Sequence, residues 1–226
     1  MPISYNVMET VSLHDLHQEA LTELATIAGG SALEPLECAL IKMGLAASVT
    51  LLDRSALSVA IEEAFDRGAT AVQVQEVIAL VSGLGVHSLM VSAVTVLDAA
   101  SRRGLASSTE ALDPERQRIW DARIGDDPFW ASFELELPGF LHALLTLSPD
   151  IFNGFLDYCA IPWRSGTVSG KVKELTAMAC DATPTHRFRP GFRVHLKNAI
   201  KLGLGQTAIL QVLDIAANAT SHHGTR

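Results

Sequence analysis

The chain has few cysteines and lacks the short motifs that most often carry redox or metal chemistry. Its three cysteines, Cys38, Cys159 and Cys180, lie far apart and form no CxxC pair, so no dithiol redox centre is visible. There is no HExxH sequence, no GxSxG elbow, no P-loop and no GxGxxG after a strand pattern. We therefore expect no metal site and no cofactor. Reduced thiols, and an N-terminal stretch without a signal-peptide pattern, predict a cytoplasmic protein.

Basic residues are outnumbered over the chain as a whole. The 226 residues contain 17 Lys+Arg against 25 Asp+Glu, a formal net charge of −8, which argues against a nucleic-acid-binding protein. The 48% of hydrophobic residues is enough to build a sizeable core.

Formal charge is missing from residues 77–97, a stretch long enough to span a bilayer. The stretch contains His87, several Ser and Thr residues and two glycines, and it lacks flanking aromatic residues. These features favour a helix buried in a core or in an oligomer interface, and we expect no membrane partner.

No segment shows sustained period-two alternation, so we predict an all-α fold without a sheet. Residues 36–80 align without a gap with residues 171–215, at the offset that joins Arg54 to Arg189. Extending the alignment to residues 87 and 222 gives ten identical pairs, which indicates an internal repeat. The pairs are Leu40/Leu175, Met43/Met178, Ala47/Ala182, Thr50/Thr185, Arg54/Arg189, Val59/Val194, Ala64/Ala199, Gly68/Gly203, Val77/Val212 and His87/His222. We divide the chain into a first unit, residues 1–105, and a second unit, residues 106–226.

Each unit is predicted to contain three helices. They cover 36–48, 54–67 and a segment from about 70 in the first unit, and 171–183, 190–202 and a segment from about 205 in the second. Gly68 and Gly203 suit the left-handed residue that follows a helix. The third helix of the first unit is expected to run on to about Ala100, and Ser148-Pro149 predicts another helix start.

Acidic residues are absent between Ala182 and Leu213, where five cations and two histidines gather. On the helix opened by Pro190, His195 shares an apolar face with three other residues, Phe192, Leu196 and Ala199. Arg193, Lys197 and Lys201 form an i, i+4 stripe away from that face, and we expect groups outside the helix to neutralise them. The first unit has Ala60 where the second has His195, so the helical scaffold does not require a histidine there.

Two interpretations of this window remain open. His195 is either a catalytic acid–base, because histidine titrates near neutral pH, or a core histidine satisfied by a backbone carbonyl. The cations are either a binding site for a small anionic molecule or a surface that is solvated or paired with a neighbouring subunit. The candidate ligand-binding residues are Arg187, Arg193, Arg189 and His186, since guanidinium matches carboxylate bidentately. Arg189 has a counterpart in Arg54 and could be structural, as could His87 and His222, which the units share.

The stretch 195–217, "HLKNAIKLGLGQTAILQVLDIAA", and its counterpart at 60–82 resemble the carboxymuconolactone decarboxylase and alkylhydroperoxidase AhpD-like family. The resemblance covers roughly half of the chain and looks like the fused members with two all-α units per chain. It implies a homotrimer. It also implies a lyase that acts on a small carboxylate or lactone, with His195 as general acid–base.

The residues that define the two branches of that family are missing. Counting back from His195, the cysteines of the peroxidase motif CxxCxxxH are replaced by Phe188 and Gly191, so thiol peroxidase activity is not expected. The decarboxylase glutamate four residues before the histidine is also Gly191. A non-catalytic helical oligomer or a small-ligand-binding protein is therefore the alternative.

Overall fold

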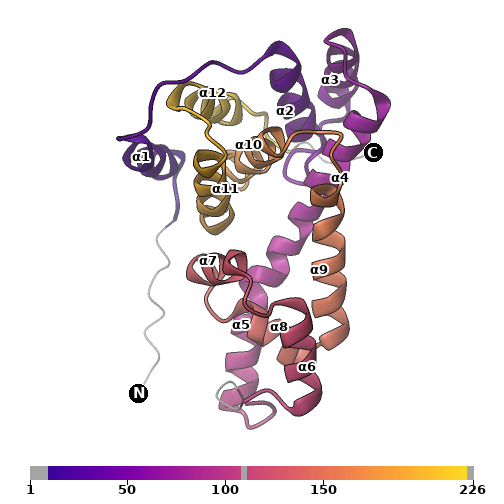
Figure 1. Cartoon of the computed structure of the whole chain (residues 1–226), viewed down its shortest axis with the longest axis vertical. Coiled ribbons are helices and arrows are strands. Elements are labelled where there is room, and N and C mark those ends of the chain that lie inside the picture. The colour runs from indigo at the N-terminus through magenta and orange to yellow at the C-terminus, as the bar shows by residue number, and fades with distance from the viewer. Residues whose placement is uncertain (1–9, 108–110, 223–226) are drawn as a thin grey trace.

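The computed structural model describes residues 10–107 and 111–222, and these residues form helices and loops without a strand. Figure 1 shows the helices in two parts. One part holds α1 (Leu13–Leu24), α2 (Pro35–Ala47), α3 (Arg54–Asp66), α4 (Ala71–Ser82), α10 (Gly170–Asp181), α11 (Arg189–Lys201) and α12 (Gln206–Ala217). The other holds α5 (His87–Arg102), α6 (Pro114–Arg123), α7 (Pro128–Glu136), α8 (Phe140–Leu147) and α9 (Pro149–Arg164). The predicted all-α class is confirmed.

Helix bounds follow the offset found in the sequence. Thr50 and Thr185, an aligned pair, are 135 residues apart. The first and last residues of α11 lie at this same distance from those of α3, and the first and last residues of α12 lie at this distance from those of α4. Gly68 and Gly203 both have positive φ, 92° and 83°, after α3 and α11. These two glycines end their helices in the left-handed conformation that only glycine adopts without steric cost.

A second pair of aligned residues is left-handed without being glycine. Leu52 and Arg187, with φ of 43° and 50°, precede α3 and α11. In each turn the backbone N–H bonds to the carbonyl four residues back, Leu52 to Ser48 and Arg187 to Thr183. Such a conformation costs of order 1–3 kcal/mol and persists only where the surroundings impose it. Both halves of the chain therefore use the same strained entry into the helix.

The predicted long helix at the end of the first unit is wrong in one respect. α4 ends at Ser82, a 3₁₀ turn (Gly83–Val86) follows, and α5 starts at His87. The sequence of that turn, GLGV, explains the break, because its two glycines weaken the helix. After this turn the start of α5 lies beside the C-terminal end of α10, where His87 is close to Asp181.

α10 is the central helix of its part and packs against α2, α4, α11 and α12. It crosses α2 closely, since a Cβ on Gly44 would lie 2.6 Å from Cγ2 of Thr176. Buried residues occur around most of its surface, and four of them are polar: Lys173, Glu174, Thr176 and Asp181. Buried charges on a central helix require partners or a function.

One of these charges has a structural partner. Nζ of Lys173 lies 2.6 Å from Oε1 of Glu76 on α4 and donates to the carbonyl of Ser165 at 2.7 Å. Glu76 also accepts hydrogen bonds from the Ser165 hydroxyl and from the backbone of Val168. This buried pair joins α4, α10 and the connection that follows α9. It leaves Glu174 and Asp181 as the charges of α10 to be explained.

Candidate functional site

His195 pairs with Glu174 across the contact between α11 and α10. Nδ1 of His195 lies 2.7 Å from Oε2 of Glu174, and the side chain of Asn198 donates to the other carboxylate oxygen at 3.2 Å. The indole of Trp163, near the end of α9, stacks on the imidazole with ring centroids 6.4 Å apart. The His195 side chain is 20% exposed. Both oxygens of Glu174 are thus engaged, and the imidazole ring is held in a fixed orientation.

The surroundings of His195 favour its charged form. Burial lowers the pKa of this imidazole. The hydrogen bond to Glu174 and the negative charges of Glu174 and Asp181 raise the pKa by more than burial lowers it, so the net direction is upward from 6.5. A carboxylate accepts hydrogen bonds and does not donate them, so Nδ1–H of His195 donates to Glu174. Nε2 is then the atom that can give or take a proton.

A second cluster lies at the C-terminal end of α10. Nδ1 of His87 and Nε2 of His186 are 2.8 Å apart, and both lie near Oδ1 of Asp181, at 3.7 Å and 3.6 Å. The two imidazole rings are nearly parallel, with an interplanar angle of 4°. The ring of Phe188 stacks on His87 with a centroid separation of 4.0 Å. Three elements therefore bring three potential ligands together: the start of α5, the end of α10 and the turn before α11.

Asp181 is the most unusual member of this cluster. It is 1% exposed, and neither of its carboxylate oxygens has a hydrogen-bond partner among the described residues. Burial raises its pKa to about 8, opposed by the positive charge of His195. Burial likewise lowers the pKa of His186 and lowers that of His87 to about 3, where the neighbouring histidines add to the effect. Both imidazoles of the cluster are therefore neutral at pH 7.

A cavity of about 580 Å³ joins the two groups. Most of its lining is apolar and comes from α4, α5, α7 and α9, including Met90, Phe133 and Trp163. Its polar lining includes His87, Asp127, Tyr158, Glu174, Asp181, His195 and Asn198. A pocket of this size, apolar with a few convergent polar groups, is the usual form of a small-molecule site.

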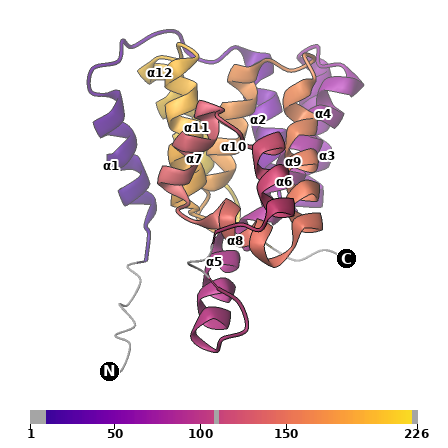
Figure 2. The same ribbon diagram turned by 60° about the horizontal axis from the view of Figure 1, so that its bottom comes forward.

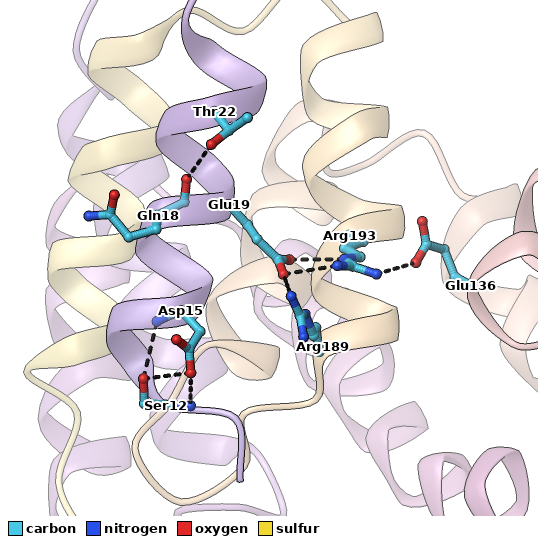
Figure 3. A network of polar contacts seen from close by, with 8 residues as sticks. All are labelled: Ser12, Asp15, Gln18, Glu19, Thr22, Glu136, Arg189 and Arg193. Carbon is cyan, nitrogen blue, oxygen red and sulfur yellow. Dashed lines mark hydrogen bonds and ion pairs between the residues drawn. The ribbon is translucent and has the colours of Figure 1, made fainter. Parts of the chain in front are cut away.

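The predicted cation cluster lies elsewhere. Arg193 forms a bidentate pair with Glu19 of α1 at 2.9 Å and approaches Glu136 of α7 at 3.5 Å, and Arg189 also pairs with Glu19 (Figure 3). Lys197 reaches Glu136 at 2.7 Å. The expectation that outside groups neutralise the cation stripe is thus met for Arg193 and Lys197, by acids of the same chain. These arginines line a different hollow, between α1 and α11, and none of them lines the cavity beside His195.

The structure separates the remaining predicted site residues. Arg187 is half-buried in its left-handed turn and does not line the cavity. His186 joins His87 and Asp181 rather than the arginines. His87 and His222, aligned in the sequence, have different positions, because His87 begins α5 whereas His222 lies beyond the end of α12. A shared structural role for these two histidines does not fit their placement.

Sequence reasoning missed Glu174, Asp181 and Asn198, although one signal was present. The comparison that sets His195 against Ala60 also sets Glu174 against Ala39 and Asp181 against Ala46. Glu174 and Asp181 are seven residues apart, so they lie on one side of their helix. The counterparts of His195, Glu174 and Asp181 in the first unit are all alanine, so these three groups belong to the second unit alone.

The fold and the site together define an all-α protein with a histidine–carboxylate pair on the wall of a cavity. The chain matches no protein-family model and no curated protein. It is similar to a crystal structure from Burkholderia xenovorans described as a "putative gamma-carboxymuconolactone decarboxylase subunit", with 30% sequence identity and a TM-score of 0.69. The likeness covers 81% of this chain and 71% of that one. The chain belongs to the carboxymuconolactone decarboxylase and AhpD-like family.

Proposed function

We propose that the protein is a lyase in which His195, oriented by Glu174, transfers a proton to or from a small molecule in the cavity. The observation that supports this most strongly is the 2.7 Å contact between Nδ1 of His195 and Oε2 of Glu174 at the cavity wall. In this proposal Glu174 takes the place of the family glutamate that is absent at position 191, because its carboxylate reaches the same histidine from α10.

The proposed step needs only groups of this chain. After a carboxylate group leaves the substrate as CO₂, its electron pair stays on carbon as a carbanion. Protonated His195 donates its Nε2 proton to that carbon, and solvent then returns a proton to the imidazole. Glu174 stabilises the protonated form, while Trp163 and the apolar lining keep bulk water away from the carbanion.

The cavity also bears on the class of substrate. Its described lining contains no Arg or Lys, and it includes the acids Asp127, Glu174 and Asp181. His195 is the only described lining group that the surroundings favour in the cationic form, so we propose a substrate with a single carboxylate, either a simple monocarboxylate or a lactone that carries one carboxylate, rather than a dicarboxylate. An anion-binding role of Arg187, Arg189 and Arg193 remains a prediction; for Arg189 and Arg193 it requires substrate in the hollow between α1 and α11.

A thermal-shift screen of lactones and small carboxylates, followed by turnover assays on the hits, tests this function, because a ligand that binds the native state raises its stability. We expect His195→Ala to lower turnover by about 100-fold or more, the usual range for a lost general acid, and Glu174→Gln to lower it less. Lys197→Gln, on the same helix but facing Glu136, is the matched control and is expected to keep full activity. Unchanged turnover in a folded His195→Ala protein would refute the proposal.

The alternative is a ligand-binding protein without catalysis, which the mostly apolar cavity lining also supports. In that case a hit stabilises the wild-type protein but is recovered chemically unchanged after prolonged incubation.

Arg187→Ala and Arg193→Ala provide a separate comparison, since an anion clamp at these residues predicts a raised ligand dissociation constant in both.

We propose a homotrimer as the assembly, which is what the family resemblance implies. Support comes from the run Ala71–Arg102, which by length and composition alone is apolar enough to cross a membrane, and whose 18-residue apolar window is only 28% buried within the chain. A second copy of the chain covering this surface would remove it from water.

A further inference from the structure

The cluster formed by His87, Asp181 and His186 has the geometry of an open metal site. The three atoms that face one another, Nδ1 of His87, Nε2 of His186 and Oδ1 of Asp181, are separated by 2.8, 3.6 and 3.7 Å. A point equidistant from all three lies about 2.0 Å from each, and zinc binds imidazole nitrogen at about 2.0–2.1 Å and carboxylate oxygen at about 2.0–2.2 Å. The three side chains thus already lie at ligand distance from one common point.

Asp181 supplies a second, independent observation. This carboxylate is buried, and neither oxygen has a hydrogen-bond partner among the described residues, yet Oδ1 faces two histidine nitrogens. A buried carboxylate without partners is costly and uncommon in a folded protein. The buried lysine of the same helix, Lys173, pairs with Glu76 and does not reach Asp181. A cation between the three side chains would satisfy Asp181.

We propose that Nδ1 of His87, Nε2 of His186 and Oδ1 of Asp181 bind a divalent first-row transition-metal ion of the zinc class. Two imidazoles and one carboxylate suit Zn²⁺, Co²⁺ or Fe²⁺, whereas Mg²⁺ and Ca²⁺ prefer oxygen ligands. The sequence does not reveal this site, because the three ligands come from separate elements and follow no fixed spacing.

Binding changes the local arrangement in a defined way. The hydrogen bond between His87 and His186 is lost, because the nitrogen that donates in it has to give up its proton, by a change of tautomer, before both nitrogens can bind the ion. The His87 ring is stacked on Phe188, which restricts its movement. The cavity touches His87 and Asp181, so an ion held here presents a free coordination position to the cavity.

The test is metal binding by the full chain without any substrate, so its result does not depend on the proposed lyase activity. Protein stripped with a chelator is titrated with Zn²⁺ by calorimetry and with Co²⁺ by visible absorption, which reports the coordination number. We expect one tight equivalent per chain. We expect Asp181→Asn and His186→Ala each to weaken it by about 100-fold or more, beyond the effect of outer-shell changes.

Two controls separate this site from adventitious binding and from misfolding. His14 and His17 are exposed on α1, three residues apart, and the double variant His14→Ala/His17→Ala is expected to keep the tight equivalent. Asp181→Asn preserves the shape of the side chain, and the His186 side chain is 19% exposed in a turn, so at least one variant is expected to keep its helical circular dichroism. The proposal is refuted if stripped wild-type protein binds no Zn²⁺. It is also refuted if a folded Asp181→Asn or His186→Ala protein binds Zn²⁺ with the same affinity as the wild type.

Discussion

At the scale of single residues, the site depends on a glycine. A Cβ on Gly191 would lie 2.3 Å from Oδ2 of Asp181 and 2.8 Å from Cδ1 of Phe188. The glutamate that the resemblance places at this position therefore has no room while Asp181 occupies the space. The carboxylate beside His195 comes instead from Glu174, one helix away. A side chain at position 191 and the carboxylate of Asp181 therefore compete for the same space.

This packing predicts that Gly191→Ala destabilises the protein. An added methyl group has to displace Asp181 and Phe188 in a packed site, and overpacking of this kind costs about 1–3 kcal/mol. The free energy of unfolding, measured by urea denaturation, checks it. Gly154→Ala is the matched control, because Gly154 lies in α9 with open space around its Cα and is expected to gain about 0.5–1 kcal/mol from the same substitution. Equal shifts in the two variants would contradict the close contact at Gly191.

At the scale of helices, apolar periodicity, caps and breakers predicted most of the bounds. α11 starts at Arg189 with Pro190 in its first turn, and α9 starts after Ser148, whose hydroxyl accepts from the backbone of Ile151. The break at Gly83 between α4 and α5 was missed, because glycines weaken a helix without fixing whether it continues or turns. Local sequence determines where a helix starts and stops, but the direction of the next helix depends on packing.

The site was predictable only in part for the same reason. His195 was visible because it interrupts an apolar face, whereas Glu174 and Asp181 resemble ordinary solvated residues of a helix until α10 is known to be central. Buried polar residues on a central helix are identified by tertiary packing, which the periodicity of one helix does not reveal.

The contact between α10 and α11 predicts a pH-dependent stability. The pKa of His195 is raised above 6.5, so the stabilisation from this contact is fully present below pH 6.5 and is lost as the pH rises through the folded-state pKa. Three groups face the imidazole: Glu174 and Asp181 from α10, and His87 from α5. Glu174→Gln removes the hydrogen-bonded charge, so its stability deficit relative to wild type is expected to be largest near pH 6 and to shrink at higher pH.

Urea unfolding of both proteins at a series of pH values between about 5.5 and 8.5 measures this difference across the titration of the imidazole. Asp113, whose pKa is lowered by hydrogen bonds from Arg116, lies far along the chain, and Asp113→Asn is the control. Its deficit is expected to stay constant over the same range, because a carboxyl with a lowered pKa remains ionised there. A Glu174→Gln deficit that is independent of pH would show that His195 carries no charge in this contact.

At the scale of the whole molecule, the two parts of the fold differ in how much apolar surface they leave exposed to solvent. The part around α10 encloses a continuous apolar core. α5 packs one stripe, including Ala93 and Leu97, against α8 and leaves Val91 and Val96 59% and 52% exposed. In Figure 2 this helix extends below the others. Ser92, Thr95 and Asp98 are exposed on the same helix, so its outer surface is mixed rather than uniformly apolar.

With exposed Ser92 and Thr95 among its valines, this surface fits a second copy of the chain better than the hydrocarbon of a lipid bilayer. Light scattering at micromolar concentration is expected to give three times the mass of one chain. Val91→Glu with Val96→Glu is expected to reduce it toward that of one chain, because buried like charges oppose association. Val59→Glu, at a 69% exposed position of α3, is expected to leave the mass unchanged. A wild-type protein that is monomeric, or that floats with phosphatidylcholine vesicles in a density gradient, would contradict the trimer.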